Sequence, residues 1–227
     1  MTPADLVGRG PLLLDFDGPV CSIFAGYPAP EVAQHLVSLL QAEGVAPPAS
    51  IVGQADPLEV LRWTDASCPP ALVVTVEDEL CAAEIRAVAT ASPTPYGHEV
   101  IREASRAGIP TAIVSNNSAG AVAAYLSKHG LLQYISPIVG RAYAHPALMK
   151  PNPMPILSAV QALRAELKDC VLVGDSPADV EGARAAGIRV IAYANRPWKI
   201  DAFRAADVVV TSMDSVLAAV APHTRGT

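Results

Sequence analysis

Two carboxylates placed close together are the residues of this chain best suited to chemistry. Asp15 and Asp17 follow the apolar run 12–14 and precede Gly18. A strand of such residues is expected to be buried, with its end at the carboxyl edge of a sheet, where α/β proteins build their sites. Two like charges this close should raise one pKa unless a cation lies between them, and Mg²⁺ is the simplest cation that neutralises both. Taken alone, however, the Asp-Phe-Asp-Gly string is more typical of a solvated turn.

Three further expected strand ends also carry polar groups. Ser115 and Asn116 open a helix, so a hydroxyl and free backbone N–H groups could bind an anion there, although an ordinary N-cap has the same pattern. Lys150 lies just before a Pro-rich helix start and could neutralise a phosphoryl group or remain a solvated loop lysine. Asp175 and Asp179 could ligate a metal or only line a helix N-terminus.

The four strand ends are more informative together than singly. They supply a carboxylate pair, a hydroxyl, a lysine and a second carboxylate pair. These are the parts that phosphoryl transfer needs: a nucleophile, an acid/base, an anion cradle, a cation clamp and a metal cage. The combination therefore favours a phosphoryl-transfer site.

The elements that must position these residues form two patterns. From about residue 95, helices and strands alternate, which predicts a parallel sheet covered by helices. We expect helices over 99–107, 119–128, 154–167, 178–186 and 215–220, and strands over 112–114, 138–139, 170–173, 190–193 and 208–210. Residues 20–93 show helical spacing and no clear strand, so we expect a helical insertion bounded near Val20 and by the turn at 92–95.

The strings DFDG, SNN, KP and GDSPAD, in this order, resemble the four motifs of the haloacid dehalogenase superfamily of phosphohydrolases. The pattern around Gly174 and Gly187 is similar to that of its phosphoglycolate-phosphatase-like branch. The resemblance implies a Rossmann-like core domain of residues 1–19 and 94–227, and a small all-helical cap domain of residues 20–93 inserted after the first strand. One departure is Pro19, where the family usually has threonine; proline removes a backbone donor and stiffens the link to the cap.

The resemblance also implies a role for each motif residue. Asp15 would attack phosphorus and become an aspartyl phosphate, while Asp17 would protonate the leaving oxygen and later activate water. Ser115 and the backbone of Asn116 would bind the phosphoryl oxygens. Lys150 would offset the charge between the nucleophile and the phosphate. By the same resemblance, magnesium would be held by Asp15, the main-chain carbonyl of Asp17, and Asp175, with Asp179 supporting this shell.

The implied activity is that of a magnesium-dependent phosphatase acting on a small phosphorylated metabolite. Within the superfamily, dehalogenases lack an acid at the position of Asp17, so this residue favours phosphate-ester chemistry. A phosphosugar mutase is the nearest alternative. A non-catalytic binding protein that kept the fold is a second alternative, which the presence of Asp15 and Asp175 disfavours.

The composition limits the remaining possibilities. Half of the 227 residues are hydrophobic (51%) and 17% are charged, which permits a sizeable core. The net charge of −6 argues against a general nucleic-acid or anionic-membrane binder. The four cysteines lack metal-ligand spacing and are expected to be free thiols. With no signal-peptide pattern and no membrane-spanning run, a soluble, cytoplasmic monomer or homodimer is expected.

Two further groups of side chains have open roles. Arg62 and Trp63 could bind the leaving group, but a solvated arginine and a tryptophan packed in the cap core are the simpler expectation. Four histidines show no ligand spacing and are expected to titrate at the surface: His98, His129, His145 and His223.

Overall fold

A computed structural model describes residues 1–221 of the chain. Within this part, six parallel strands form one sheet in the order β5-β4-β1-β6-β7-β8. Their bounds are β1 Leu12–Leu14, β4 Thr111–Val114, β5 Ile138–Val139, β6 Val171–Gly174, β7 Arg189–Tyr193 and β8 Val208–Val210. The register places Leu14 beside Ile113 and Val173, so the carboxyl ends of the three central strands lie together. The predicted α/β fold with a parallel sheet flanked by helices is confirmed.

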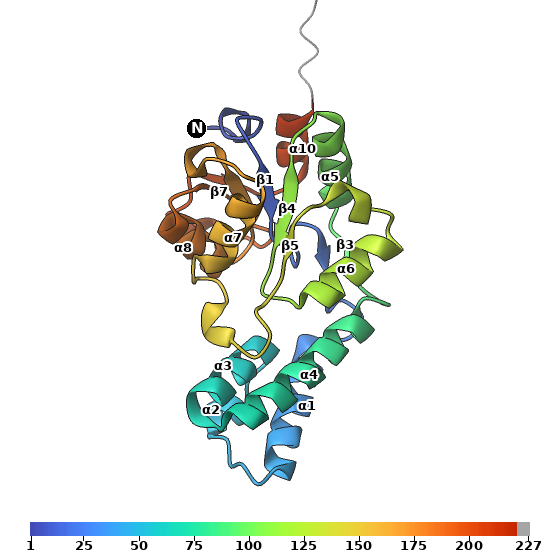
Figure 1. Cartoon of the computed structure of the whole chain (residues 1–227), viewed down its shortest axis with the longest axis vertical. Coiled ribbons are helices and arrows are strands. Elements are labelled where there is room, and N and C mark those ends of the chain that lie inside the picture. The colour runs from blue at the N-terminus through green and yellow to red at the C-terminus, as the bar shows by residue number, and fades with distance from the viewer. Residues whose placement is uncertain (222–227) are drawn as a thin grey trace, which may run out of the picture.

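Helices cover both faces of the sheet (Figure 1). One face packs against α5 (Gly97–Arg106), α6 (Ala119–Lys128) and α10 (Asp214–Val220), and the other against α7 (Met154–Ala162) and α8 (Pro177–Ala186). Leu12 and Leu14 enter the first core and Leu13 the second, because successive strand side chains point to opposite faces. Burial on both faces explains why β1 is wholly apolar.

Four helices lie between the short strands β2 (Cys21–Ser22) and β3 (Ser92–Pro93) in the chain: α1 (Ala29–Ala42), α2 (Ala49–Val52), α3 (Pro57–Ser67) and α4 (Pro70–Ala87). These helices, here called the helical unit, gather at the end of the molecule opposite the N-terminus (Figure 1). They share a core that includes Leu36, Leu61 and Leu80. Helix α3 begins with Pro57 at its first position, and the Asp56 carboxylate accepts from the backbone N–H of Leu58 at 2.9 Å.

Two predicted element assignments are wrong. Two-residue strands β2 (Cys21–Ser22) and β3 (Ser92–Pro93) pair antiparallel where no strand was expected, because two residues are too short to show a period. Helix α7 ends at Ala162 rather than at residue 167, and Arg164 adopts a φ of 53°, which a helix cannot continue. The prediction of a helix up to residue 167, made from the apolar spacing that continues to Leu167, was therefore wrong at this end.

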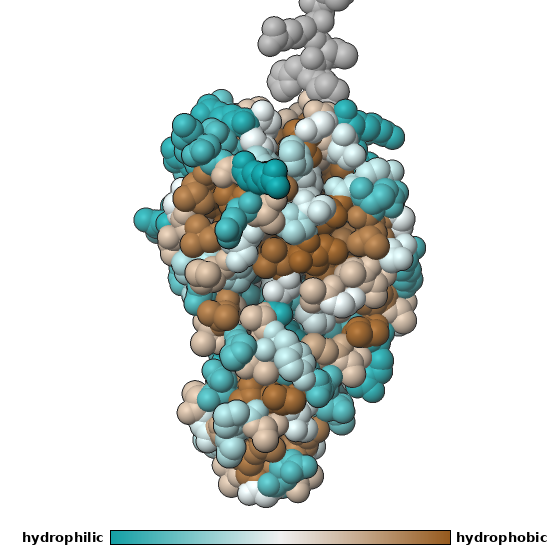
Figure 2. Space-filling model, viewed as in Figure 1, coloured by the Kyte–Doolittle hydropathy of each residue, from teal (hydrophilic) through white to brown (hydrophobic). Residues whose placement is uncertain are grey.

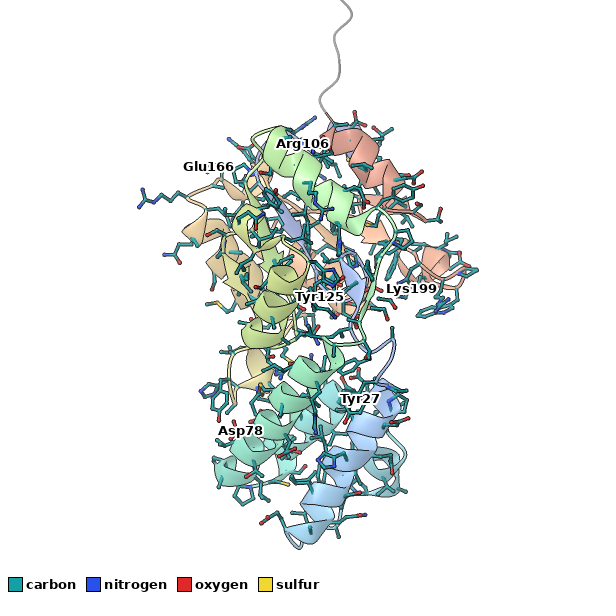
Figure 3. The ribbon with its side chains drawn as sticks, turned by 90° about the vertical axis from the view of Figure 1, so that its right-hand side faces the viewer. Tyr27, Asp78, Arg106, Tyr125, Glu166 and Lys199 are labelled. Atoms are coloured by element: carbon teal, nitrogen blue, oxygen red, sulfur yellow. The ribbon has the colours of Figure 1, made fainter. Side chains whose placement is uncertain are left out.

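The histidine expectation is also wrong for His98. This side chain is buried and its Nε2 lies 2.9 Å from the hydroxyl of Tyr125, which sits in the middle of the α/β part (Figure 3). The His129 ring contacts both rings in tilted arrangements, with its centroid 5.0 Å from that of His98 and 4.3 Å from that of Tyr125. His145 is exposed. His223, and the predicted core-domain range beyond residue 221, lie outside the described residues.

No helix in residues 1–221 is long and apolar enough to cross a membrane. All four cysteines are free thiols.

Candidate active site

The predicted chemistry-bearing residues converge at the carboxyl edge of the sheet. A cavity of about 360 Å³ opens there, where the molecule narrows between the helical unit and the sheet (Figure 2). Its sheet side is lined by Asp15, Asp17, Ser115, Asn116, Lys150 and Asp175, and its other side by α3 residues that include Glu59 and Arg62. Asp179 is fully buried behind this edge. The strand order places the β1, β4 and β6 ends next to one another, so residues far apart in the chain meet.

Lys150 lies at the centre of this group and is almost fully buried (1% exposed). Its Nζ is 2.9 Å from Oδ1 of Asp15 and 2.6 Å from Oδ1 of Asp179. It also donates to the carbonyl of Val114 at 2.7 Å. A reciprocal pair of hydrogen bonds with the Asn116 side chain holds the Lys150 backbone, at 2.9 and 3.1 Å. The ammonium is therefore fixed between two carboxylates.

Burial perturbs the titration of these groups. Desolvation, followed by repulsion from Asp179, raises the pKa of Asp15 to about 8 against the opposing pull of Lys150. Desolvation also raises the pKa of Asp17 to about 6, although a hydrogen bond from the backbone N–H of Ile23 opposes the rise. Burial disfavours the charged Lys150, but the two carboxylates outweigh it and raise its pKa to about 12. The burial of these carboxylates therefore disfavours the ionised forms of Asp15 and Asp17.

Asp175 and Asp179 occupy different environments. Oδ2 of Asp175 pairs with Nζ of Lys199 at 2.6 Å and accepts from Asn195 at 2.9 Å; Lys199 lies at the side of the α/β part (Figure 3). Oδ2 of Asp179 accepts three hydrogen bonds, from the backbone N–H groups of Asp175 and Ser176 and from the Ser176 hydroxyl. Asp179 thus holds both Lys150 and the turn that carries Asp175.

Carboxylate oxygens of Asp15, Asp175 and Asp179 lie within 4.8 Å of one another. With Asp17, the cluster has four carboxylates against the ammonium groups of Lys150 and Lys199, which leaves two negative charges if all are ionised. Close approach of the turns requires Gly18, since a Cβ there would lie 2.2 Å from Cγ of Asp175 and its φ is 112°. This donor set suits a hard divalent cation.

The loop of residues 115–118, here called the anion loop, connects β4 to α6. Ser118 caps α6 by accepting from the backbone N–H of Ala121. The Ser115 hydroxyl and the side chain of Asn117 lie 3.2 Å apart, and the N–H of Asn117 donates to the same hydroxyl at 3.2 Å. Of the loop amides, only that of Asn116 lacks a backbone or side-chain acceptor within the described part. This N–H is therefore free for a ligand.

Arg62 is not the solvated residue that the sequence suggested. Its guanidinium donates to the main-chain carbonyl of Lys150 at 2.8 Å, pairs with Glu59, and lines the cavity. Trp63 packs against the core of the helical unit, as expected.

The sequence reasoning missed a buried ion cluster beside the anion loop. Arg141 pairs with Glu77 and Glu84 of α4 at 2.8 and 2.9 Å, and all three side chains are at most 1% exposed. The two glutamates are seven residues apart and lie on the buried face of α4 with Val76 and Leu80. The signal in the sequence was the position of these two glutamates among the apolar residues of one helix face.

The comparisons with known proteins agree with this geometry. The family model described as haloacid dehalogenase-like hydrolase matches residues 75–193, more than half of the chain. The chain belongs to this family. Its match to the model includes the anion loop, Lys150 and the turn with Asp175. The sequence resemblance to haloacid dehalogenase-like hydrolases is thus confirmed.

Individual relatives of this haloacid dehalogenase-like hydrolase are phosphatases by name. A phosphoglycolate phosphatase from Pectobacterium atrosepticum is 28% identical over 193 residues, which cover 83% of this chain and 81% of the relative. A bifunctional riboflavin kinase/FMN phosphatase from Arabidopsis thaliana is 32% identical over 52% of this chain. The chain matches only about a third to a half of the length of several curated relatives.

Solved structures show the same fold. The crystal structure of a predicted phosphatase from Clostridium acetobutylicum superposes with a TM-score of 0.71 at 15% identity, covering 92% of this chain and 96% of that one. At an identity of 15%, this similarity shows the fold alone.

Proposed function

We propose that the protein is a magnesium-dependent phosphatase of a small phosphorylated metabolite, acting through an aspartyl phosphate on Asp15. The observation that carries this proposal is the placement of Asp15 at the cavity, 2.9 Å from a buried lysine and near a second acid, Asp17. The family membership and the phosphatase names of several relatives support it. The cavity of about 360 Å³ is of a size for a small metabolite.

Asp15 is the proposed nucleophile. Its Oδ1 accepts from the backbone N–H of Phe16 at 2.7 Å and contacts Nζ of Lys150, so Oδ2 is the oxygen available to attack phosphorus. Attack forms the Oδ2–phosphorus bond and breaks the bond between phosphorus and the leaving oxygen. Because burial raises the pKa of Asp15, added positive charge at the site is needed to keep it ionised.

Asp17 is the proposed acid and base. Its Oδ1 is held by the backbone N–H of Ile23 at 2.9 Å, and its pKa, raised by burial, lets it keep a proton that an exposed aspartate would lose. It gives this proton to the leaving oxygen. As a carboxylate, it then takes a proton from the water that hydrolyses the aspartyl phosphate.

The phosphoryl oxygens have three proposed donors: the Ser115 hydroxyl, which would turn to them from Oδ1 of Asn117, the Asn116 backbone N–H and Nζ of Lys150. All three residues line the cavity. Donors fixed in advance stabilise the charge that develops on the transferring group without reorganising during the reaction.

The residues present fit a magnesium ion. Asp15 and Asp175 would supply carboxylate oxygens and Asp17 its main-chain carbonyl, whereas the oxygens of Asp179 are already engaged and support this shell. Oδ1 of Asn195, next to Asp175, is buried and has no hydrogen-bond partner among residues 1–221, so it marks a further polar position at this end of the cluster. When bound, Mg²⁺ offsets the negative charge of the cluster and of the transferring phosphoryl group.

We further propose that residues 20–93 act as a cap domain over a core of residues 1–19 and 94–227. The helical unit supplies one wall of the cavity, and the chain enters and leaves it through the paired strands β2 and β3. A cap placed in this way would exclude water during transfer to Asp15.

The direct test is phosphate release from a panel of phosphomonoesters by the purified protein with magnesium chloride. We expect release from at least one small phosphorylated metabolite, and its loss in Asp15→Asn. If no member of a broad panel is hydrolysed, the non-catalytic alternative replaces the proposal. Phosphate retained on an isomeric product rather than released would indicate the mutase.

A further inference from the structure

The buried ion cluster of Glu77, Glu84 and Arg141 joins the helical unit to the sheet. Figure 1 shows α4 running from the helical unit up to α6, and Arg141 lies just after β5. Two carboxylates around one guanidinium leave one negative charge in the interior. A buried charge is costly unless it accepts further hydrogen bonds.

Glu84 receives these further bonds from the anion loop. Its Oε1 accepts from Nδ2 of Asn117 at 3.2 Å, and its Oε2 accepts from the backbone N–H of Ser118 at 2.8 Å. Within the described residues, the hydrogen bonds of Glu77 come only from Arg141 and from the thiol of Cys81. The two glutamates therefore share the arginine but differ in their contact with the loop.

Arg141 holds the same loop through its backbone. Its guanidinium donates to the carbonyl of Asn116 at 2.6 Å, and its backbone N–H donates to the carbonyl of Asn117 at 2.9 Å. With Ser118 held by Glu84, the two peptide groups that directly follow the free N–H of Asn116 are fixed. The cluster thus holds the backbone immediately after the peptide group that we expect to bind a phosphoryl oxygen.

Glu84 also determines how the Asn117 amide is turned. A carboxylate only accepts hydrogen bonds, so Asn117 must present Nδ2 to it and Oδ1 to the hydroxyl of Ser115, 3.2 Å away. A carboxamide at position 84 could donate as well as accept, and Asn117 could then turn either way.

We infer that Glu84, held by Arg141, is a positioning residue for phosphate binding by the anion loop. The inference rests on the proposed function, in which Ser115 and Asn116 bind the phosphoryl group. Glu84 acts through Asn117 and Ser118.

The test compares Glu84→Gln with Glu77→Gln as its matched control. Each variant leaves one glutamate paired with Arg141 and removes one buried charge from the same helix, so their thermal stabilities should change similarly. Inorganic phosphate is titrated calorimetrically into each protein in magnesium chloride. We expect the phosphate Kd to rise about tenfold in Glu84→Gln, the scale of one lost hydrogen bond to a charged group. In Glu77→Gln it should stay within about twofold of wild type.

In turnover assays, Glu84→Gln should raise KM more than it lowers kcat. If Glu84→Gln fails to fold, Asn117→Ala removes the side-chain partner of Glu84 and should weaken phosphate binding in the same direction. Equal weakening in both glutamate variants, unchanged binding in Glu84→Gln, or no phosphate binding by the wild type would overturn the inference. If the two glutamate variants differ in phosphate binding as expected, but the wild type hydrolyses no phosphomonoester, the inference is supported and the proposed phosphatase activity is refuted.

Discussion

The ammonium of Lys150 and the carboxylate of Asp179 form an ion pair of 2.6 Å in which both side chains are at most 2% exposed. This pair keeps the lysine against Asp15, whose Oδ1 lies 2.9 Å from the same ammonium. The backbone of the Asp175 turn donates to the same Asp179. Asp179 therefore contacts both Lys150, which we propose to bind the phosphoryl group, and the turn that carries Asp175, a proposed magnesium ligand.

Lys150→Met should lower both the activity and the stability. Without the ammonium, two buried carboxylates lose their counter-charge, which costs roughly 3–5 kcal/mol of unfolding free energy. Loss of the donor to the phosphoryl group should lower kcat by about 10²–10³-fold. Denaturant unfolding and steady-state kinetics measure the two effects. Lys168→Met, at an exposed lysine, is the control and should leave both unchanged. A stable, active Lys150→Met protein would contradict the assignment.

Asp17→Asn should slow hydrolysis according to how much the leaving group needs a proton. For an alkyl phosphate, we expect kcat/KM, which reports the first transfer step, to fall by about 10²–10⁴-fold, the usual contribution of a general acid. For 4-nitrophenyl phosphate, whose leaving phenolate is already stable, the fall in kcat/KM should be much smaller, although kcat falls because activation of water is impaired. Equal losses of kcat/KM with both substrates would show that Asp17 is not the acid.

Magnesium should stabilise the folded protein, because it offsets the excess negative charge around Asp15 and Asp175. At about 100 times the Kd, a ligand bound only by the folded state adds roughly 2.7 kcal/mol, equivalent to a rise in Tm of roughly 5–10 °C for a chain of this size. Differential scanning calorimetry with and without magnesium chloride measures the rise. It should be retained in Asp65→Asn, an exposed position, and be largely lost in Asp175→Asn. A wild-type Tm independent of magnesium would exclude this site.

The buried His98 should make stability depend on pH. Desolvation, followed by the positive charges of His129 and Arg102, lowers its pKa in the folded protein, whereas Glu99 opposes this. The unfolded chain therefore binds a proton near pH 6.5 that the folded protein does not, so the contribution of His98 to stability falls as the pH drops below that value, whereas the raised pKa values of Asp15 and Asp17 act in the opposite direction. The difference in melting temperature between wild type and His98→Asn, measured from pH 7.5 to pH 5, isolates the part of the slope due to His98, with about pH 6.5 as its expected onset.

His98→Asn should reduce this slope, although the contact with Tyr125 is lost at every pH. The pKa of His129 is also lowered by burial, so part of the slope should persist. His145→Asn, at an exposed position, should keep the full slope. The same slope in His98→Asn as in the wild type would contradict this explanation.

The sequence predicted the parts of the site that depend on local signals. Asp15, Ser115 and Asp175 each follow a short apolar strand, and strands of this kind end at one edge of a parallel sheet. The strand and helix alternation was therefore enough to place them together. Motif resemblance added Lys150, which has no strong local signal of its own.

The remaining features depend on contacts between distant segments. Glu84 contacts Arg141 and Asn117 only because α4 packs beside α6, and no local sequence pattern predicts this packing. The burial of His98 depends likewise on Tyr125 of a different helix. Strands β2 and β3 have two residues each, too few for alternation to show.

Detection of the covalent intermediate tests the central claim most directly. The protein is mixed with magnesium and its best phosphomonoester, quenched with acid during turnover, digested and analysed by peptide mass spectrometry. We predict the added mass of one phosphoryl group on Asp15 in the wild type, accumulating further in Asp17→Asn when the assay uses 4-nitrophenyl phosphate, because activation of water is then impaired. Active enzyme that carries the phosphoryl group on another residue would contradict Asp15 as the nucleophile.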